Sequence, residues 1–409
     1  MKWASALSGN DLPKERKYGG AKRLLGECAE QIAFQLSNEK PDLVIVFVSV
    51  DFSREYDQIP ALCKNLFGTA NIIGCCAGGL IGAGIEVEKD QAIAVTAATL
   101  PGVQLELNHF EDASLPDLDS PPCAWEKLVK VENADEPTFI LLPDPFSFKI
   151  DALVQGLDYA FPKSVKLGGL ASGASRPGMN ALFCGEQLHR SGVVVASIAG
   201  NITVDSVVAQ GCRPIGHPMT VTKCHNNFLI ELDNEPAVNV LKNTLTRLSS
   251  DDQALAYNSL FLGVVMDEFK DDFKAGDFLI RNILGIEPRT GALMVGEVLR
   301  NERTVQFHLR DAATSADDLR LMLKRYTQEH GAADKNNVAG ALLFSCLGRG
   351  KYLYGQSNHD SDCFREILGE VPLGGFFCNG EIGPVGGTTF LHGYTSSFGL
   401  FRDKAGANS

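Results

Sequence analysis

Hydrophobic and polar positions follow a helical rhythm in some parts of the chain and a strand rhythm in others. Apolar residues recur at helical spacing within residues 21–36, which predicts a helix with one apolar side. The run at 43–50 is continuous and rich in β-branched residues, as in a strand covered on both faces. A second helix over 54–67 and a strand over 71–75 repeat this order, so the pattern predicts α/β alternation.

The rest of the chain continues with short strands and fewer helices. Amphipathic segments predict helices over residues 148–161, 236–248, 314–330 and 360–368. Short apolar or alternating runs predict strands over residues 91–99, 102–110, 138–142, 165–170, 193–198, 202–209, 219–222, 228–231, 261–265, 278–283, 292–295, 304–309, 338–345, 371–378, 388–392 and 397–401. Residues 111–122 are predicted as a loop, and the tract 249–253 is polar. We therefore expect an α/β fold with mixed, largely antiparallel sheets, layered with helices in two domains.

One local pattern occurs three times. A helix, a strand and then a Gly- or Cys-rich turn appear at residues 74–79, 168–173 and 374–380. This echo indicates either an internal duplication or the same turn chemistry used three times, and the sequence alone leaves both open.

Length and charge narrow the class of protein. The chain has 409 residues, which favours two or three domains. It carries 37 Lys and Arg against 50 Asp and Glu, a formal charge of −13, with no basic cluster that could neutralise phosphates. We therefore expect no binding to nucleic acid or to an anionic membrane. The apolar runs are too short to cross a bilayer, the N-terminus lacks a signal-peptide pattern, and the eleven cysteines are expected to be reduced, so we expect a cytoplasmic protein.

Common cofactor and metal signatures are absent from the sequence. The spacings GxGxxG, GxxxxGK[ST] and GxSxG do not occur, which argues against a nucleotide site or a serine-hydrolase elbow. No two cysteines have CxxC spacing, and the group His217, Cys224 and His225 lacks an obvious fourth ligand. We expect no cofactor and no metal.

The strongest local motif is a thiol followed by an arginine between two glycines. Cys346 ends an apolar strand, and Arg349 and Gly350 follow it. Ligands of open α/β sheets bind beyond the carboxyl ends of strands, and an Arg there could hold a carboxylate through a bidentate fork. The blander alternative, a buried Cys with Arg349 in a surface ion pair, is favoured on spacing alone.

Two further motifs carry polar groups near predicted strand ends. Asn379 and Gly380 form a turn dipeptide, and Glu381 follows directly, so an amide and a carboxylate could orient an amine or a hydroxyl. In residues 305–311, alternation places Gln306, His308 and Arg310 on one strand face. That face could line a polar cavity, although periodicity favours the solvent face of an antiparallel sheet.

Taken in order, these motifs make the chain resemble the FIST family (F-box and intracellular signal transduction), with its paired N-terminal and C-terminal domains. The resemblance rests on residues 1–6, 74–75 with the turn after them, 168–171, 211–216, 281–285, 305–311, 346–350, 379–382 and 392. It implies an N-terminal domain over residues 19–220 and a C-terminal domain over residues 221–402. It further implies a sensory module that binds small molecules such as amino acids, attached to kinases, cyclases or chemotaxis receptors in bacteria and to an F-box in eukaryotes. No F-box, kinase or other output segment is recognisable here, so we expect a stand-alone binder that signals through an unidentified protein partner.

The predicted ligand-binding residues all fall in the C-terminal half. They are Arg281, His308, Arg310, Cys346, Arg349, Gly350, Asn379, Gly380, Glu381 and His392. Two alternatives stay open: a thiol-dependent hydrolase or acyl transferase with Cys346 as nucleophile and His392 as base, and a protein-interaction scaffold.

Overall fold

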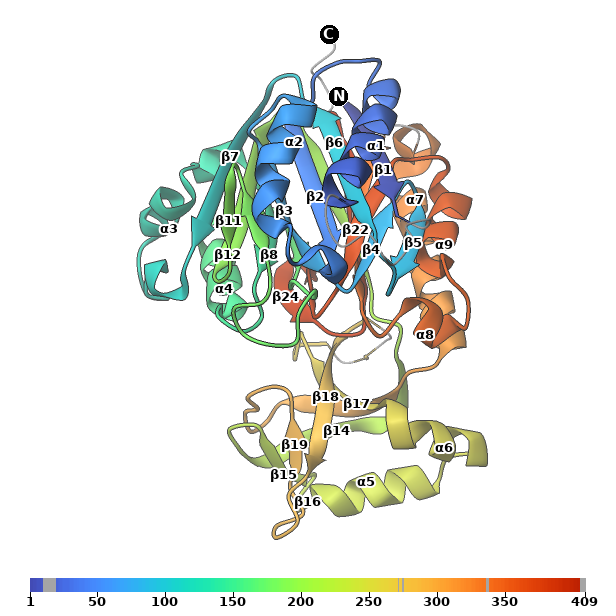
Figure 1. Cartoon of the computed structure of the whole chain (residues 1–409). Coiled ribbons are helices and arrows are strands. Elements are labelled where there is room, and N and C mark those ends of the chain that lie inside the picture. The colour runs from blue at the N-terminus through green and yellow to red at the C-terminus, as the bar shows by residue number, and fades with distance from the viewer. Residues whose placement is uncertain (10–19, 271, 274–275, 336–337, 405–409) are drawn as a thin grey trace. The chain divides into compact units, whose positions relative to one another are not determined.

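The computed structural model describes residues 1–9, 20–270, 272–273, 276–335 and 338–404 (Figure 1). It contains four sheets, three mixed and one antiparallel, with helices, which confirms the predicted α/β class with mixed and antiparallel sheets. The chain divides into two compact units, the first formed by Met1–Val208 with Arg320–Ser409 and the second by Ala209–Leu319. The predicted boundary at residue 220 lies within a single strand, β14 (Arg213–His225).

The first unit is built from three repeats with one element order: strand, helix, strand, helix, strand, hairpin, strand. The first repeat comprises β1 (Lys2–Ser8), α1 (Gly20–Gln35), β2 (Leu43–Ser49), α2 (Ile59–Phe67), β3 (Ile72–Ala77), β4 (Gly79–Gly82), β5 (Ile85–Glu88) and β6 (Ile93–Thr99). The second comprises β7 (Val103–Phe110), α3 (Pro122–Val129), β8 (Thr138–Pro143), α4 (Ile150–Ala160), β9 (Lys166–Gly169), β10 (Leu182–Cys184), β11 (Gln187–His189) and β12 (Val193–Gly200). The third comprises β13 (Thr203–Ala209), α7 (Ala312–Lys335), β21 (Val338–Cys346), α8 (Gly350–Tyr354), α9 (His359–Leu368), β22 (Leu373–Cys378), β23 (Glu381–Val385), β24 (Thr388–His392) and β25 (Ser396–Arg402), with α8 as an addition to the common order.

Strand pairing is the same in the three repeats. The parallel pairs are β2 with β3, β8 with β9, and β21 with β22. The last strand of each repeat, β6, β12 or β25, lies between the first and the second strand of that repeat. Each hairpin then joins the sheet of another repeat: β4 pairs with β22, β10 with β3, and β23 with β9. The three sheets are thus completed by exchange, and the echo seen in the sequence is a structural repeat.

A glycine at the same place in each repeat explains part of that echo. Gly74, Gly168 and Gly375 lie opposite Val46, Leu141 and Leu343 on the neighbouring parallel strands. A Cβ at any of the three glycines would lie 1.8–1.9 Å from the carbonyl oxygen of its partner residue. No side chain can be accommodated at that distance, so the close approach of the parallel strands requires glycine.

The three sheets share one apolar core and carry helices on their outer faces. Side chains from all three sheets, including Phe47, Leu167 and Phe376, meet in this core. Helices α1 and α2 pack on the other face of the first sheet, and α3 and α4 pack on that of the second (Figure 1). Strands buried on both faces explain the continuous apolar runs in the sequence.

The second unit is a seven-stranded antiparallel sheet with two helices. Its strands run in the order β14, β20 (Thr304–Leu309), β17 (Leu260–Val265), β18 (Phe278–Ile286), β19 (Leu293–Val295), β15 (Phe228–Leu232) and β16 (Glu235–Pro236), and β14 also pairs with β15. The helices α5 (Ala237–Thr246) and α6 (Ser250–Ser259) contribute to its apolar core.

The structure differs from the predicted elements at several places, among them β1, β4, β5, β10, β11 and α8, for which no element was predicted. The tract 249–253 begins helix α6, because the Ser249 hydroxyl accepts a hydrogen bond from the Asp252 N–H at 3.2 Å and caps the helix. Helix α3 and strand β23 form in segments for which no element was predicted. None of the helices in the described part of the chain combines the length and apolar character that a membrane crossing requires.

Candidate functional site

Three predicted site residues of the first unit hydrogen-bond to one short segment, residues 394–396. The backbone N–H of Cys346 donates to the Thr395 carbonyl at 3.0 Å, and Arg349 Nη1 donates to the Tyr394 carbonyl at 3.4 Å. The Thr395 N–H and hydroxyl donate to Glu381 Oε2 at 2.9 and 2.7 Å. The structure therefore brings Cys346, Arg349 and Glu381 together around this segment.

Arg349 makes a buried ion pair instead of a surface one. Its side chain is 0% exposed, and Nε and Nη2 donate to the two carboxylate oxygens of Asp360 at 2.8 and 3.2 Å. Burial would raise the pKa of Asp360, but the Arg349 charge and hydrogen bonds from His359, Arg349 and Ser396 lower it well below its ordinary value. A ligand carboxylate at Arg349 would have to replace Asp360, and the ligand-binding role of Arg349 stays a prediction.

Glu86 of β5 lies beside this ion pair. Its Oε1 accepts hydrogen bonds from the backbone N–H and the hydroxyl of Ser361, both at 2.8 Å. Its Oε2 is buried and has no hydrogen-bond partner among the residues that the structure describes. Burial, together with the negative charge of Asp360, raises the pKa of Glu86 to about 8.

Glu381 and His392 are direct partners across the β23–β24 hairpin, and both are buried. His392 Nε2 donates to the Gly383 carbonyl at 3.0 Å, which fixes the ring. Cys346 is half-buried, and its Sγ accepts from the Gly348 N–H at 3.4 Å. The thiol–imidazole pair of Cys346 and His392 stays a prediction.

The predicted residue Asn379 lies where the strand ends of the three repeats meet. Its side-chain amide donates to the Ala171 carbonyl at 3.2 Å. In the same region the Ser172 hydroxyl accepts from the Gly78 N–H at 3.0 Å and donates to the Phe377 carbonyl. The segments after β3, β9 and β22 are thus tied together by side chains that the sequence did not single out.

Gly350 and Gly380 have structural explanations of their own. Gly350 has a φ of +59°, and a Cβ there would lie 2.5 Å from Glu88 Oε1. A Cβ at Gly380 would lie 2.9 Å from the Leu170 side chain. The positive φ favours glycine at position 350, and close packing favours it at position 380; their predicted contact with a ligand stays a prediction.

The remaining predicted residues lie in the second unit. Arg281 pairs with Glu297, and the polar face of β20 is buried, not solvated. Gln306 donates to the Gly216 carbonyl at 3.2 Å, and His308 Nδ1 lies 3.0 Å from the Gln306 carbonyl. Burial lowers the pKa of His308 to about 4, so this ring is neutral at pH 7. Arg310, on the same face, is 5% exposed.

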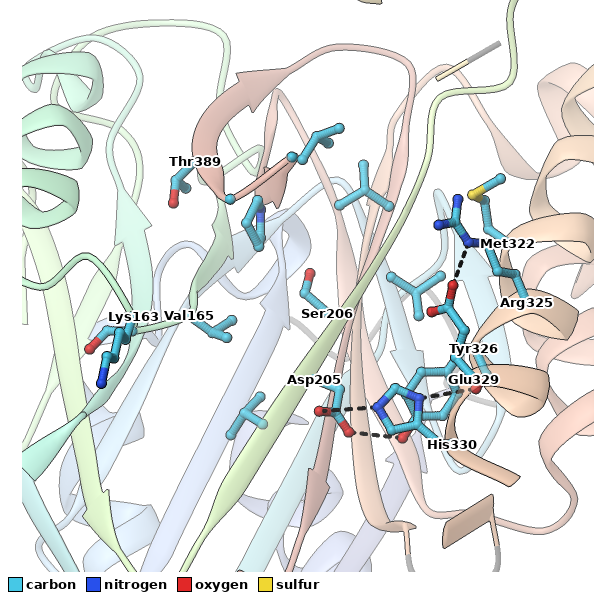
Figure 2. Close-up of a pocket in the computed structure, with 18 of the residues that line it drawn as sticks. Lys163, Val165, Asp205, Ser206, Met322, Arg325, Tyr326, Glu329, His330 and Thr389 are labelled. Carbon is cyan, nitrogen blue, oxygen red and sulfur yellow. Dashed lines mark hydrogen bonds and ion pairs between the residues drawn. The ribbon is translucent and has the colours of Figure 1, made fainter. Parts of the chain in front are cut away.

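The first unit also contains a cavity of about 490 Å³ that sequence reasoning missed. Its walls are five consecutive residues of β13 (204–208), one side of α7, the connection before β9 (162–165) and the turn between β23 and β24 (384–387) (Figure 2). In the view of Figure 2, Ser206 lies between the α7 side chains and the group Lys163, Val165 and Thr389.

Charged groups of both signs line this cavity. Asp205 accepts from the Tyr326 hydroxyl at 2.9 Å and from Arg402 Nε at 2.6 Å, and His330 Nε2 lies 3.8 Å from its carboxylate. Arg325 and Glu329, one helical turn apart on α7, form an ion pair at 2.7 Å.

Two serines in the cavity wall have unsatisfied hydroxyls. The Oγ atoms of Ser164 and Ser206 are buried and lack a hydrogen-bond partner within the described ranges. A buried hydroxyl without a partner costs free energy, which a bound polar group could relieve. The sequence held only a weak signal for this site: Asp205 and Ser206 interrupt the apolar residues of the strand at 203–209, and α7 carries Arg325 and Glu329 at i, i+4 spacing.

Within the described part of the chain, no group of three or more His, Cys, Asp or Glu residues is arranged to hold a metal ion.

Comparison with known proteins places this architecture in a family. The FIST N domain model matches residues 42–235, and the FIST C domain model matches residues 237–384. An uncharacterized protein of Mycobacterium tuberculosis is 35% identical over 383 residues, 93% of this chain and 97% of that protein. An uncharacterized protein of Mycobacterium bovis is 34% identical over 385 residues, 94% of this chain and 96% of that protein. The human F-box only protein 22 is 46% identical over 50 residues, 12% of each chain.

The two domain models together span most of the chain, and the mycobacterial relatives match it almost from end to end. FIST domains are in general sensory modules of signal transduction. The chain therefore belongs to the FIST family, with both its N and its C domain.

Proposed function

We propose that this chain is a cytoplasmic sensory protein that binds an amino acid or a related small metabolite in the cavity between β13 and α7, and signals through a protein partner. The observation that carries the proposal is the wall of the cavity, which presents both signs of charge. A zwitterion needs a cation for its carboxylate and an anion for its ammonium, and Arg325 and Glu329 supply both within one helical turn when the ligand replaces their mutual ion pair. The volume of about 490 Å³ is in the range of small-molecule sites.

A thermal-shift screen of amino acids and related metabolites tests the proposal. A ligand at a hundredfold excess over its Kd adds about 2.7 kcal/mol to the free energy of unfolding, which raises the melting temperature. We expect Arg325→Glu to remove this shift, because the reversed charge repels the ligand carboxylate.

Arg320→Glu is the matched control on the same helix. Arg320 also holds a surface glutamate, Glu366, at 2.8 Å, but it does not line the cavity. The control should lose a similar ion pair and keep the ligand-induced shift. Equal effects of the two variants, or no shift with any metabolite, would contradict the proposal.

The residues predicted from the sequence enter the same assay as a competing site. Asn379→Ala removes an exposed amide at the meeting point of the three repeats. If this variant abolishes the shift while Arg325→Glu keeps it, the ligand binds near the predicted residues Cys346 and Asn379 and not in the cavity.

A further inference from the structure

The three repeats place three equivalent corners around the first unit. Each corner contains the first strand, the first helix and the hairpin turn of one repeat. It also contains a connection from another repeat, the one that leads into the strand with which that hairpin pairs. The cavity described above is the corner of the third repeat. A smaller cavity of about 210 Å³, lined by β1, α1, the β4–β5 turn and the connection before β22, is the corner of the first repeat. The hairpin turns are alike: each has two residues, and the first of them, Ala83, Gly185 or Gly386, has a positive φ of 49°, 59° or 61°.

In the first repeat, the chain itself fills the corner with a carboxamide. The Gln35 side chain accepts from the Ser5 N–H at 3.1 Å and donates to the Ser5 carbonyl at 2.9 Å. The Ser5 hydroxyl donates to the Leu373 carbonyl at 2.8 Å and accepts from the Ala83 N–H at 2.9 Å. Strand β1 is the outermost strand of its sheet, so the Gln35 amide takes the place that a neighbouring strand would have.

In the third repeat, Ser206 occupies the corresponding place. It is the fourth residue of β13, as Ser5 is the fourth residue of β1, and β13 is likewise the outermost strand of its sheet. Its hydroxyl is buried without a partner in the described structure, and the cavity beside it has more than twice the volume of the sister cavity. Helix α7 faces the cavity with Met322, Arg325, Tyr326, Glu329 and His330, none of which carries a carboxamide.

We propose that the ligand of this cavity is an amino acid with a carboxamide side chain, of the glutamine or asparagine class. Its carboxamide accepts from the Ser206 N–H and donates to the Ser206 carbonyl, as Gln35 does at Ser5. Its ammonium and carboxylate groups meet the Glu329 and Arg325 side chains. This inference rests on the proposed function and specifies the ligand class of the same site.

Titration calorimetry of the full chain with L-glutamine, L-asparagine, L-glutamate and L-methionine tests the inference. Glutamine or asparagine should bind at least about tenfold more tightly than glutamate, because a carboxylate cannot donate to the Ser206 carbonyl and leaves a buried polar group unpaired. Methionine, similar in length but without the amide, should also bind about tenfold more weakly. Glutamate or methionine binding as tightly as glutamine would overturn the carboxamide assignment and leave the proposed function standing. The absence of binding by any amino acid would overturn both.

Two serine variants locate the binding. Ser206→Pro should weaken glutamine binding by at least about tenfold, since it removes the backbone N–H from which the carboxamide oxygen accepts. Ser5→Ala, in the sister corner, should lower the melting temperature by breaking two hydrogen bonds and leave glutamine affinity unchanged. A loss of affinity in Ser5→Ala but not in Ser206→Pro would contradict the assignment. The ligand series on the wild-type chain decides the question even if a variant folds poorly.

Discussion

Replacing Glu86 with Gln should make the protein less sensitive to alkaline pH. The carboxyl of Glu86 is buried beside Asp360, and its pKa is raised from an ordinary 4.5 to about 8. Between these values the folded chain holds a proton that the unfolded chain releases, so the free energy of unfolding falls as the pH rises. The favourable contribution of the protonated carboxyl is complete below pH 4.5 and is lost as the pH passes 8. The slope is at most about 1.4 kcal/mol per pH unit, with an upper limit of about 5 kcal/mol over the whole window.

The Gln variant keeps the side-chain oxygen that accepts from Ser361 and cannot ionise. Urea unfolding of both proteins at intervals from pH 5 to pH 8.5 gives the difference in unfolding free energy, in which all other titrating groups cancel. We expect the free energy of unfolding of the variant to rise steadily with pH relative to that of the wild type. Glu88→Gln, on the same strand, is the matched control: it keeps Glu86, and the Glu88 charge is the smallest of the causes that shift the Glu86 pKa, so most of the wild-type slope should remain. Parallel curves for the wild type and Glu86→Gln would refute the reasoning.

Further stability predictions follow from burial and close packing. Arg349→Ala leaves the Asp360 charge buried without its cation and should lower the free energy of unfolding by about 3–5 kcal/mol. Adding Asp360→Asn should recover part of this loss, and urea curves showing no recovery would argue against the ion pair. Gly156→Ala places a Cβ 2.2 Å from the Trp125 ring and should destabilise the protein by about 1–3 kcal/mol. Gly26→Ala, on a helix position with open space, should stabilise it by up to about 1 kcal/mol, and thermal melts in which both glycine variants shift in the same direction would contradict the packing argument.

Local periodicity was sufficient for most of the elements. Buried strands such as β2 and β21 read as apolar runs, and Gly369 ends α9 with a positive φ, as expected of a helix C-terminus. Alternation also separated the two faces of β20 correctly. It could not show that the face with Gln306 and His308 is buried, because that depends on what packs against the strand.

The candidate site was harder to predict because its partners are distant in sequence or unremarkable in type. Arg349 was singled out, but its partner Asp360 is brought to it only by the packing of α9. Nothing in the sequence distinguishes Ser206 from the other serines. Only the strand order of the repeats shows that it is equivalent to Ser5. The exchange of hairpins is a long-range property, and three similar turns in the sequence do not reveal which sheet each hairpin joins.

That exchange forms a closed ring. The hairpin of the first repeat pairs with the sheet of the third repeat, that of the third with the sheet of the second, and that of the second with the sheet of the first. In a fragment limited to the FIST N segment, β4 would lack its partner β22 and β9 would lack its partner β23. Both strands would then be unpaired sheet edges, which are prone to aggregation. The N and C segments of this chain are thus not autonomous modules that could be recombined separately: within the first unit, neither completes its own sheets without strands from the other.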